Sequence, residues 1–327
     1  MSTPNVLVTG ELLVDFLPRH GNAIAESESF DRRSGGAPAN VAVGLARLGQ
    51  PPWFWTRVGR DPFGDFLVET LLDNGVPSRF VERDPTAKTP LAFVDRGSDS
   101  TVEFSFYRDG TADTRLEPGG VPKETLQAVD LVYVGSVMLA SGTARSATTD
   151  LVSRANEHGC TVVFDVNARP ELWNDGEFER VVGDLLGDID IVKATPTDLR
   201  YLPFVDASDP PEELARTLCD RGPSAAFLTL GESGSYVLAT DDALLEPGTA
   251  AHDGYEVDAI DTTGAGDAFM TGVLGALVDG ERELTAVLAF ANAVAAVSTT
   301  ARGAMPTLPT RERVRQFRAE HDPAVRE

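Results

Sequence analysis

Lysine is nearly missing from this chain of 327 residues. Only Lys88, Lys123 and Lys193 occur, so arginine supplies almost all of the 28 basic residues, which face 51 acidic ones. The formal net charge of -23 argues against nucleic acids and anionic membranes as partners. Acidic residues are spread along the whole chain, a pattern typical of proteins from salt-rich cytoplasms, where ions screen self-repulsion. We therefore expect a halophilic protein, whose stability and activity rise with molar KCl.

Cysteine, histidine and long apolar runs are also scarce. The two cysteines, Cys160 and Cys219, are too few and too far apart for a zinc site or a disulfide framework, and the four histidines show no ligand spacing. No apolar run approaches the ~18 residues of a membrane span. The first residues show no basic region or cleavage pattern, which predicts a cytoplasmic location. A Walker A loop is excluded because no lysine follows a glycine.

Apolar runs and helical patterns alternate along the chain. Strands are expected at residues 6–9, 131–134, 162–165, 189–193 and 226–230, and helices at 39–48, 61–75, 143–157, 177–186 and 212–221. This alternation predicts an α/β fold of three layers (α/β/α), a mostly parallel sheet with helices on both faces. Two stretches break the alternation, approximately residues 12–32 and 90–113. They predict a small separate β-sheet lid, inserted into a single domain that spans residues 1–327.

The stretch Asp261–Phe269 (DTTGAGDAF) joins a small-residue turn to the start of an apolar helix expected over residues 268–277. The small residues 264–266 let backbone N–H groups approach a ligand closely, and a helix N-terminus attracts anions. Asp267 lies in the first turn, where the helix dipole favours the ionised form that accepts a proton. This arrangement suits phosphoryl transfer. A helix cap behind a plain glycine turn is the structural alternative.

A second glycine motif, Ser34–Asn40 (SGGAPAN), precedes the first expected helix. Its two glycines allow close approach of the backbone to a ligand, and Asn40 offers both a donor and an acceptor to hydroxyl groups. Asp15, near the preceding strand, could accept hydrogen bonds from the same polyol. Taken alone, the motif better fits an ordinary glycine turn before a helix, with Asn40 in solvent.

Together the two motifs resemble the two signatures of the ribokinase-like (PfkB) carbohydrate kinases, and the resemblance covers roughly Val6 to Pro309. Further blocks are most similar to the fructokinase group: GELLVDF at residues 10–16, FYRDGTAD at 106–113, FDVNAR at 164–169 and FANAV at 290–294. The resemblance implies a ribokinase-like fold and an ATP-dependent sugar kinase that phosphorylates a hexose, with fructose as the expected substrate.

The resemblance also implies a role for each matching residue. Asp267 would be the base that deprotonates the sugar hydroxyl. The anion hole would be formed by the amides of Gly264, Ala265 and Gly266. The sugar would be held by Asp15, Gly35, Gly36 and Asn40. Two arginines would face the sugar or the transferred phosphate: Arg108 on the lid and Arg169 after a central strand. The alternative for each of these two arginines is that it is an ordinary surface charge without a role in binding.

For the nucleotide, the resemblance implies a loop from Thr229 through Gly231 to Gly234, with Asn292 lining the adenine pocket. Magnesium would come with ATP, and Asp198 would reach it through water, although Asp198 could simply cap the following helix. The family's usual asparagine three residues before this carboxylate is replaced by Thr195. A monovalent cation, potassium, would bind near the following residues: Asp261, Thr263, Ser298, Ala301, Gly303 and Thr307.

Rival interpretations stay open at this point. A 2-keto-3-deoxygluconate kinase would share most of these blocks, but its acid substrate needs a cation near the carboxylate. A catalytically idle sugar- or nucleotide-binding protein on the same fold is a rival of a different class. The resemblance further implies a homodimer that pairs through the lid. The sequence decides neither the sugar nor the hydroxyl that is phosphorylated.

Overall fold

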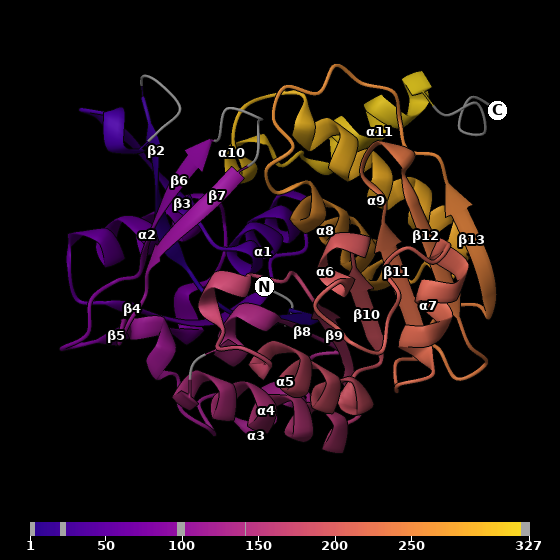
Figure 1. Cartoon of the computed structure of the whole chain (residues 1–327), viewed down its shortest axis with the longest axis horizontal. Helices are drawn as coiled ribbons and strands as arrows, with labels where there is room; N and C mark the ends of the chain where they lie inside the picture. Colours follow the sequence, from indigo (N-terminus) through magenta and orange to yellow (C-terminus); the bar gives the residue numbers. More distant parts are fainter. Residues whose placement is uncertain (1–3, 20–23, 97–101, 141, 322–327) are drawn as a thin grey trace.

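Two β-sheets organise the part of the chain that the computed structural model describes, which comprises residues 4–19, 24–96, 102–140 and 142–321. The larger sheet has nine strands in the order β13-β12-β11-β10-β9-β8-β1-β4-β5 (Figure 1). Neighbouring strands from β11 to β5 run parallel, whereas β12 and β13 add an antiparallel edge. The strands are β1 (Val6–Thr9), β4 (Trp53–Gly59), β5 (Val81–Asp84), β8 (Leu131–Gly135), β9 (Thr161–Asp165), β10 (Ile191–Ala194), β11 (Ala225–Thr229), β12 (Ser235–Ala239) and β13 (Gly248–His252).

Helices cover both faces of this sheet because both faces of its strands are apolar. Along β1, Val6 and Val8 join one buried cluster and Leu7 joins the other. The first cluster includes side chains of α1 (Ala37–Arg47), α2 (Pro62–Asp73), α8 (Ala265–Val278), α9 (Leu284–Thr299) and α11 (Arg311–His321). The second includes those of α3 (Lys123–Leu126), α4 (Gly142–Glu157), α5 (Glu177–Leu185), α6 (Pro196–Leu199) and α7 (Pro211–Cys219). The predicted three-layer α/β/α fold is confirmed.

The predicted elements match the observed ones to within a few residues, and local chemistry explains several ends. Helix α2 begins where expected because the Asp61 carboxylate accepts hydrogen bonds from the N–H groups of Phe63 and Gly64 at 3.1 and 2.9 Å. The prediction omits four strands of this sheet, β4, β5, β12 and β13, and in β4 and β5 charged residues interrupt the apolar run. Those charges pair at the edge of the sheet, where Arg57 lies 3.2 Å from Asp84.

A separate four-stranded sheet has the order β3-β2-β6-β7 and lies at the upper left of Figure 1. Its strands are β2 (Leu13–Pro18), β3 (Phe30–Gly35), β6 (Leu91–Arg96) and β7 (Val102–Tyr107). Aromatic rings hold it together, with Phe16 and Phe93 stacked 5.1 Å apart. The predicted small sheet is confirmed, although β3 extends to Gly35 and leads directly into α1. Within the predicted insertion at residues 90–113, residues 97–101 lie outside the described part of the chain.

None of the helices in the described ranges combines the length and the apolarity needed to cross a membrane. The short helix α10 (Ala304–Thr307) lies between α9 and α11 and packs against α1. Helices α8 and α9 form the most extensive helix pair, and α8 also packs along α1. The two predicted motifs at residues 34–40 and 261–269 are therefore brought together by the packing of the helices that they precede.

Candidate active site

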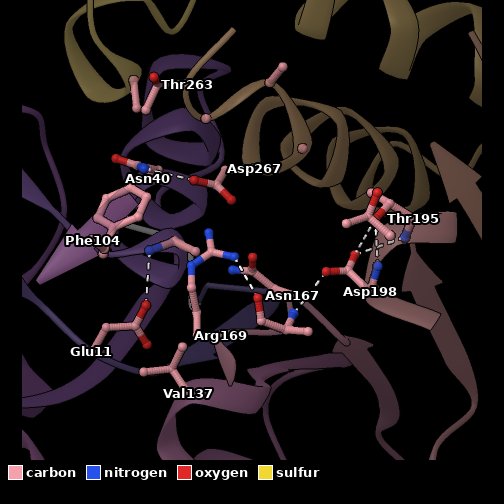
Figure 2. Close-up of a pocket in the computed structure, with 18 of the residues that line it drawn as sticks. Glu11, Asn40, Phe104, Val137, Asn167, Arg169, Thr195, Asp198, Thr263 and Asp267 are labelled. Atoms are coloured by element: carbon pink, nitrogen blue, oxygen red, sulfur yellow. Dashed lines mark hydrogen bonds between the residues drawn. The ribbon is translucent and has the colours of Figure 1, made fainter. Parts of the chain in front are cut away.

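A cavity of about 380 Å³ lies where the carboxyl ends of the central parallel strands meet the small sheet. Ligands of open α/β sheets bind at this edge because the loops gather there. The wall includes residues that follow β8, β9 and β10, the N-terminal ends of α1 and α8, and two aromatic rings of β7 (Figure 2). The predicted residues in the wall are Asp15, Gly36, Asn40, Arg169, Asp198, Thr263, Gly264, Ala265, Gly266 and Asp267.

Asp267 lies in the first turn of α8, as predicted, and is 9% exposed. Its Oδ2 accepts a hydrogen bond from Nδ2 of Asn40 at 2.8 Å, which joins the two motifs directly (Figure 2). Burial raises the pKa of Asp267 to about 6, and the hydrogen bond from Asn40 opposes that rise. The helix dipole was expected to keep this carboxylate ionised, but desolvation is the larger effect. A pKa near 6 still leaves it mostly ionised at neutral pH and suits a general base.

The turn before α8 presents backbone amides, although not all three that were predicted. Gly264 has φ of 78°, and a Cβ there would lie 2.4 Å from that of Ala304, so the turn requires glycine. The Ala265 N–H donates to the carbonyl of Thr262 at 3.1 Å and is therefore already bonded. For the N–H groups of Gly264 and Gly266, the described residues offer no acceptor. These two amides are the ones available to an anion.

Lys193 is a site residue that sequence reasoning missed. It is 3% exposed, lines the cavity at the end of β10, and its Nζ lies 3.0 Å from the position a Cβ would take on Gly266. Its Nζ donates to both carboxylate oxygens of Asp165, at 3.1 and 3.3 Å. Burial alone would lower the pKa of Lys193, but the charges of Asp165 and Asp198 raise it. The sequence feature that could have identified Lys193 as a site residue is its position at the end of a predicted strand in a chain with almost no lysine.

Most of the residues predicted to hold the sugar line the same cavity as Asp267. Asp15 is partly accessible from the cavity, and burial together with the charge of Asp267 raises its pKa to about 7. Gly35 makes room for this carboxylate, since a Cβ there would lie 2.0 Å from Asp15 Oδ2. Gly36 has φ of 107°, and a Cβ there would lie 2.4 Å from the Glu11 carbonyl. Both glycines thus shape the wall, and only Gly36 lines the cavity itself.

Glu11 is a second residue that the sequence prediction left without a role. It is 3% exposed, lines the cavity directly after β1, and its Oε1 accepts a hydrogen bond from the Ala37 N–H at 3.0 Å. Burial raises the pKa of Glu11 to about 7 against the opposing charge of Arg108. Its Oε2 and the Oδ1 of Asn40 are buried without a hydrogen-bond partner among the described residues. Such unmatched atoms in a cavity wall are typical of a ligand site.

The two predicted arginines have different positions. Arg169 reaches into the middle of the cavity, with its guanidinium carbon 5.5 Å from the ring centre of Phe104 in β7 (Figure 2). Arg108 was expected to face the sugar, but it is 5% exposed and does not line the cavity, so its contact with the sugar stays a prediction. Its Nε donates to Asp113 at 2.5 Å and its Nη1 to the Val137 carbonyl at 3.0 Å. The buried carboxylate of Asp113 holds the guanidinium inside the protein.

The residues predicted to bind the nucleotide meet one another outside the cavity wall. Thr229 ends β11, and Gly231 and Gly234 shape the tight turn into β12. Asn292 of α9 donates from Nδ2 to Ser235 Oγ at 2.6 Å and to the Leu288 carbonyl at 2.8 Å. The turn and α9 are thus adjacent, as an adenine site between them would require. The side-chain amide of Asn292 is already hydrogen-bonded within the protein, and its place in an adenine pocket stays a prediction.

Asp198 lines the cavity but its carboxylate is extensively bonded. Oδ1 accepts from the Ala168 N–H at 2.9 Å, and Oδ2 accepts from the backbone and hydroxyl of Thr195 at 2.9 and 2.7 Å. Thr195 and Asp198 form a reciprocal capping box at the start of α6. The geometry therefore fits the helix-cap interpretation of Asp198, while its magnesium role stays a prediction.

Hydrogen bonds bring together several of the residues predicted to surround a monovalent cation. Asp261 accepts from the Thr263 hydroxyl at 2.7 Å and from the Gly303 N–H at 3.0 Å. Thr307 donates its hydroxyl to the Gly303 carbonyl at 2.6 Å. Ser298 bonds within its own helix, and Ala301 lies in the exposed bend after it. The loops converge as expected, and cation binding itself stays a prediction.

Comparison with known proteins identifies the family. The model of the pfkB family carbohydrate kinases matches residues 3–311. The chain belongs to this family. It is 36% identical to probable fructokinase-2 of Arabidopsis thaliana over 313 residues, which cover 93% of each protein. The predicted family and the carbohydrate kinase class are confirmed.

Solved structures agree with this assignment. A structure of the fructokinase from Xylella fastidiosa that contains ATP superposes with a TM-score of 0.84 at 29% identity and covers 96% of this chain and 98% of that one. A double mutant of the fructokinase from Vibrio cholerae O395, with bound fructose, ADP and a potassium ion, superposes with a TM-score of 0.82 at 31% identity. That match covers 97% of this chain and 98% of that one.

Proposed function

We propose that this carbohydrate kinase is a fructokinase, which transfers the γ-phosphoryl group of Mg-ATP to a hydroxyl of fructose. The observation that carries the proposal is the buried pair of Asp267 of α8 and Asn40 of α1, which line the same cavity as Asp15. The pair places a base with a pKa of about 6 beside groups suited to sugar hydroxyls. Similarity to plant and bacterial fructokinases supports the choice of sugar.

In the proposed reaction, Asp267 accepts the proton of the attacking hydroxyl. The sugar oxygen then bonds to the γ-phosphorus, while the bond from that phosphorus to the β–γ bridging oxygen breaks and releases ADP. Asn40 Oδ1, which has no partner among the described residues, is available to a neighbouring sugar hydroxyl. Its Nδ2 meanwhile holds the base in place at 2.8 Å. The same side chain thus orients both the sugar and the base.

Charge that develops on the transferred group would be stabilised at the N-terminus of α8. The amides of Gly264 and Gly266 point their unmatched N–H groups there, and Lys193 Nζ lies beside Gly266. Donors fixed in advance stabilise such charge without reorganisation. Arg169, in the middle of the cavity, would contact the same phosphoryl group through its fork of donors.

The metal ions would depend on few side chains of this chain. Asp198 is bonded through both oxygens, so it fits a contact to magnesium through water and not a direct ligand. Magnesium would then be held mainly by the phosphates of ATP. A potassium site near Asp261 would use mostly carbonyl oxygens of the converging loops, and the relative from Vibrio cholerae contains a potassium ion.

The charges of the cavity favour a neutral sugar over an acid such as 2-keto-3-deoxygluconate. The acceptor wall carries three carboxyl groups, those of Glu11, Asp15 and Asp267. Arg108, which could have met a substrate carboxylate, is bound by Asp113. An acid would therefore have only Arg169 and the phosphate-binding Lys193 to compensate its charge, which makes fructose the better fit.

The small sheet would act as a lid over this cavity, because Phe104 and Phe106 of β7 already line it. Closure would exclude water, which competes with the sugar for the phosphoryl group. Its outer strand β7 leaves one edge of the small sheet unpaired in the described structure, and Tyr107 is 64% exposed. A homodimer formed through this lid fits the exposed edge.

The test is an ADP-release assay with fructose, 2-keto-3-deoxygluconate and ribose at high KCl, followed by phosphorus NMR of the product. Fructose should give the highest kcat/KM, and the NMR spectrum assigns the C1 or the C6 hydroxyl. A higher kcat/KM for the acid would replace the proposal by its closest rival. Absence of ADP release with every sugar would favour an idle binding protein.

A further inference from the structure

A second cavity lies away from the active site, between α11 and the turn that joins α8 to α9. Its volume of about 380 Å³ equals that of the active-site cavity, and the two share no lining residue. We call it the arginine groove. It is lined by Ala276, Asp279, Gly280, Glu281, Ala286, Phe290, Arg311, Val314, Arg315 and Arg318.

Three arginines of one helix face define this groove. Arg311, Arg315 and Arg318 follow one another at spacings of four and three residues along α11, so they lie on the same side of the helix. A local row of three guanidinium groups stands out in a protein whose net charge is -23. Arginine also presents planar paired donors, which match carboxylate and phosphate oxygens.

One acidic residue of the groove, Asp279, neutralises Arg311, whereas no acidic residue in the described part of the chain pairs with Arg315. Asp279 is bonded through both oxygens, one to Arg311 and the other to Gln50 Nε2 at 2.6 Å. Glu281 Oε1 accepts the N–H groups of Arg282 and Glu283 at 2.9 and 3.0 Å. Arg315, in contrast, forms no ion pair or hydrogen bond with any residue in the described part of the chain. Its charge is free to meet a ligand.

The floor of the groove is apolar and includes an aromatic ring. Phe290 is half-buried there, with Ala276, Ala286 and Val314 around it. The guanidinium carbon of Arg311 lies 5.9 Å from the centre of the Phe290 ring. A flat or apolar group could cover this ring while an anionic group reaches Arg315. The combination of apolar floor and convergent polar groups is typical of small-molecule sites.

We propose that the arginine groove binds a small phosphorylated ligand with a planar apolar body, such as an aryl or nucleoside monophosphate. The phosphate contacts Arg315, and the planar body covers Phe290. The site is independent of the active site. Phe290 stands two residues before Asn292 on α9, and α9 packs along α8, which carries Asp267. A ligand there contacts the helix pair that supports the catalytic groups.

The test is a calorimetric titration of the full-length protein with phenyl phosphate and with inorganic phosphate, at one fixed KCl concentration. Arg315→Gln should weaken phenyl phosphate binding by about tenfold or more, the effect of losing one charge-assisted contact. Phe290→Leu should weaken phenyl phosphate and leave inorganic phosphate unchanged. Arg313→Gln is the matched control, because Arg313 lies on the same helix and does not line the groove.

Lys193→Met separates the groove from the active site. The inference expects phenyl phosphate to bind this variant as it binds the unaltered protein. Loss of binding in Lys193→Met with full binding in Arg315→Gln would mean that the probe occupies the active site, and the inference would be wrong. It would also be wrong if the unaltered protein bound no phenyl phosphate up to about 10 mM, or if Arg313→Gln weakened binding as much as Arg315→Gln.

Discussion

The acceptor side and the nucleotide side of the proposed site are built differently. On the acceptor side, Glu11 and Asn40 line the cavity and keep buried oxygens without partners among the described residues. On the nucleotide side, the Asn292 amide donates hydrogen bonds to Ser235 and to the Leu288 carbonyl. The turn at Gly231–Gly234 does not line the cavity.

This difference indicates which half is prepared for its ligand. Unmatched buried acceptors cost free energy until a hydroxyl meets them, so the sugar side is preorganised. Two raised carboxyl pKa values, about 7 for both Glu11 and Asp15, reflect the same desolvated wall. On the proposed nucleotide side, Asn292 is already hydrogen-bonded within the protein, so we expect ATP to be recognised there mainly through the backbone. Mutations in the two halves should therefore affect different kinetic constants.

The largest effect outside the base is expected from Lys193→Met. Removal of the buried cation beside Gly266 should lower kcat by about 10²- to 10³-fold, as the loss of one fixed donor to a developing charge does. The KM for fructose should change little, because Lys193 belongs to the phosphate end. Steady-state kinetics with ATP and fructose measure both constants.

Lys123→Met is the control, because Lys123 is exposed at the start of α3. It removes an equal charge from the surface and should leave kcat within about twofold. If both variants lost activity equally, the effect would be one of overall charge. Since Lys193 also pairs with Asp165, a thermal melt must show that the variant remains folded.

A paired substitution tests the comparison itself. Asn40→Ala should raise the KM for fructose by about tenfold, since it removes a preorganised contact with a hydroxyl. It should also shift the acid limb of the pH profile of kcat upward, because the hydrogen bond from Asn40 lowers the pKa of Asp267. Asn292→Ala should change only the KM for ATP, by a smaller factor. Equal effects of the two variants on the two KM values would remove the distinction.

The raised pKa of Asp15 predicts how stability depends on pH. The folded protein holds this proton more tightly than the unfolded chain, since the pKa rises from 3.8 to about 7. Stability from this group is therefore present below pH ~4 and is lost as the pH rises through ~7. Asp15→Asn, which cannot ionise, should raise Tm more at pH 8 than at pH 5. Melts at a constant KCl concentration check this, and equal shifts at both pH values would contradict it.

Salt should change the difference between the acceptor side and the nucleotide side least, because it acts on the whole protein surface. Molar KCl should raise Tm and kcat of the unaltered protein, because it screens the repulsion within a chain of net charge -23. Sodium chloride at the same ionic strength separates screening from a potassium effect near Asp261. Full activity and an unchanged Tm in dilute buffer would refute the halophilic prediction.

The sequence predicted most of the architecture because uninterrupted apolar runs mark most of the buried strands and helices. The sequence marks both ends of helix α2, with Asp61 before Pro62 at the start and Gly75 after the last turn. Strands β4, β5, β12 and β13 were missed. In β4 and β5, Arg57 and its acidic partners interrupt the apolar pattern, and only the folded sheet shows that these charges pair. A sequence pattern thus predicts a helix or strand that its own residues mark, and misses a strand whose residues are paired by an adjacent strand.

At the site, the sequence predicted the residues whose motif fixes their backbone, such as Asp267 after the glycine turn. It could not predict residues whose role depends on a distant partner. Arg108 was placed in the sugar site, whereas Asp113 binds it internally. Lys193 was passed over, although the fold brings it beside Gly266 from a strand more than 70 residues away. Side-chain pairing across the fold decides both cases.

The most direct test of the account is Asp267→Asn, measured by single-turnover phosphoryl transfer and by calorimetric titration with fructose and ATP. The amide of Asn has the same shape as the carboxylate and keeps its contacts, but it cannot accept the proton of the sugar hydroxyl. The account predicts that transfer slows by about 10²- to 10⁴-fold, the usual contribution of a general base, while both affinities stay within about threefold. A variant that retained more than about a tenth of the transfer rate, a barrier change below ~1.4 kcal/mol, would show that Asp267 is not the base.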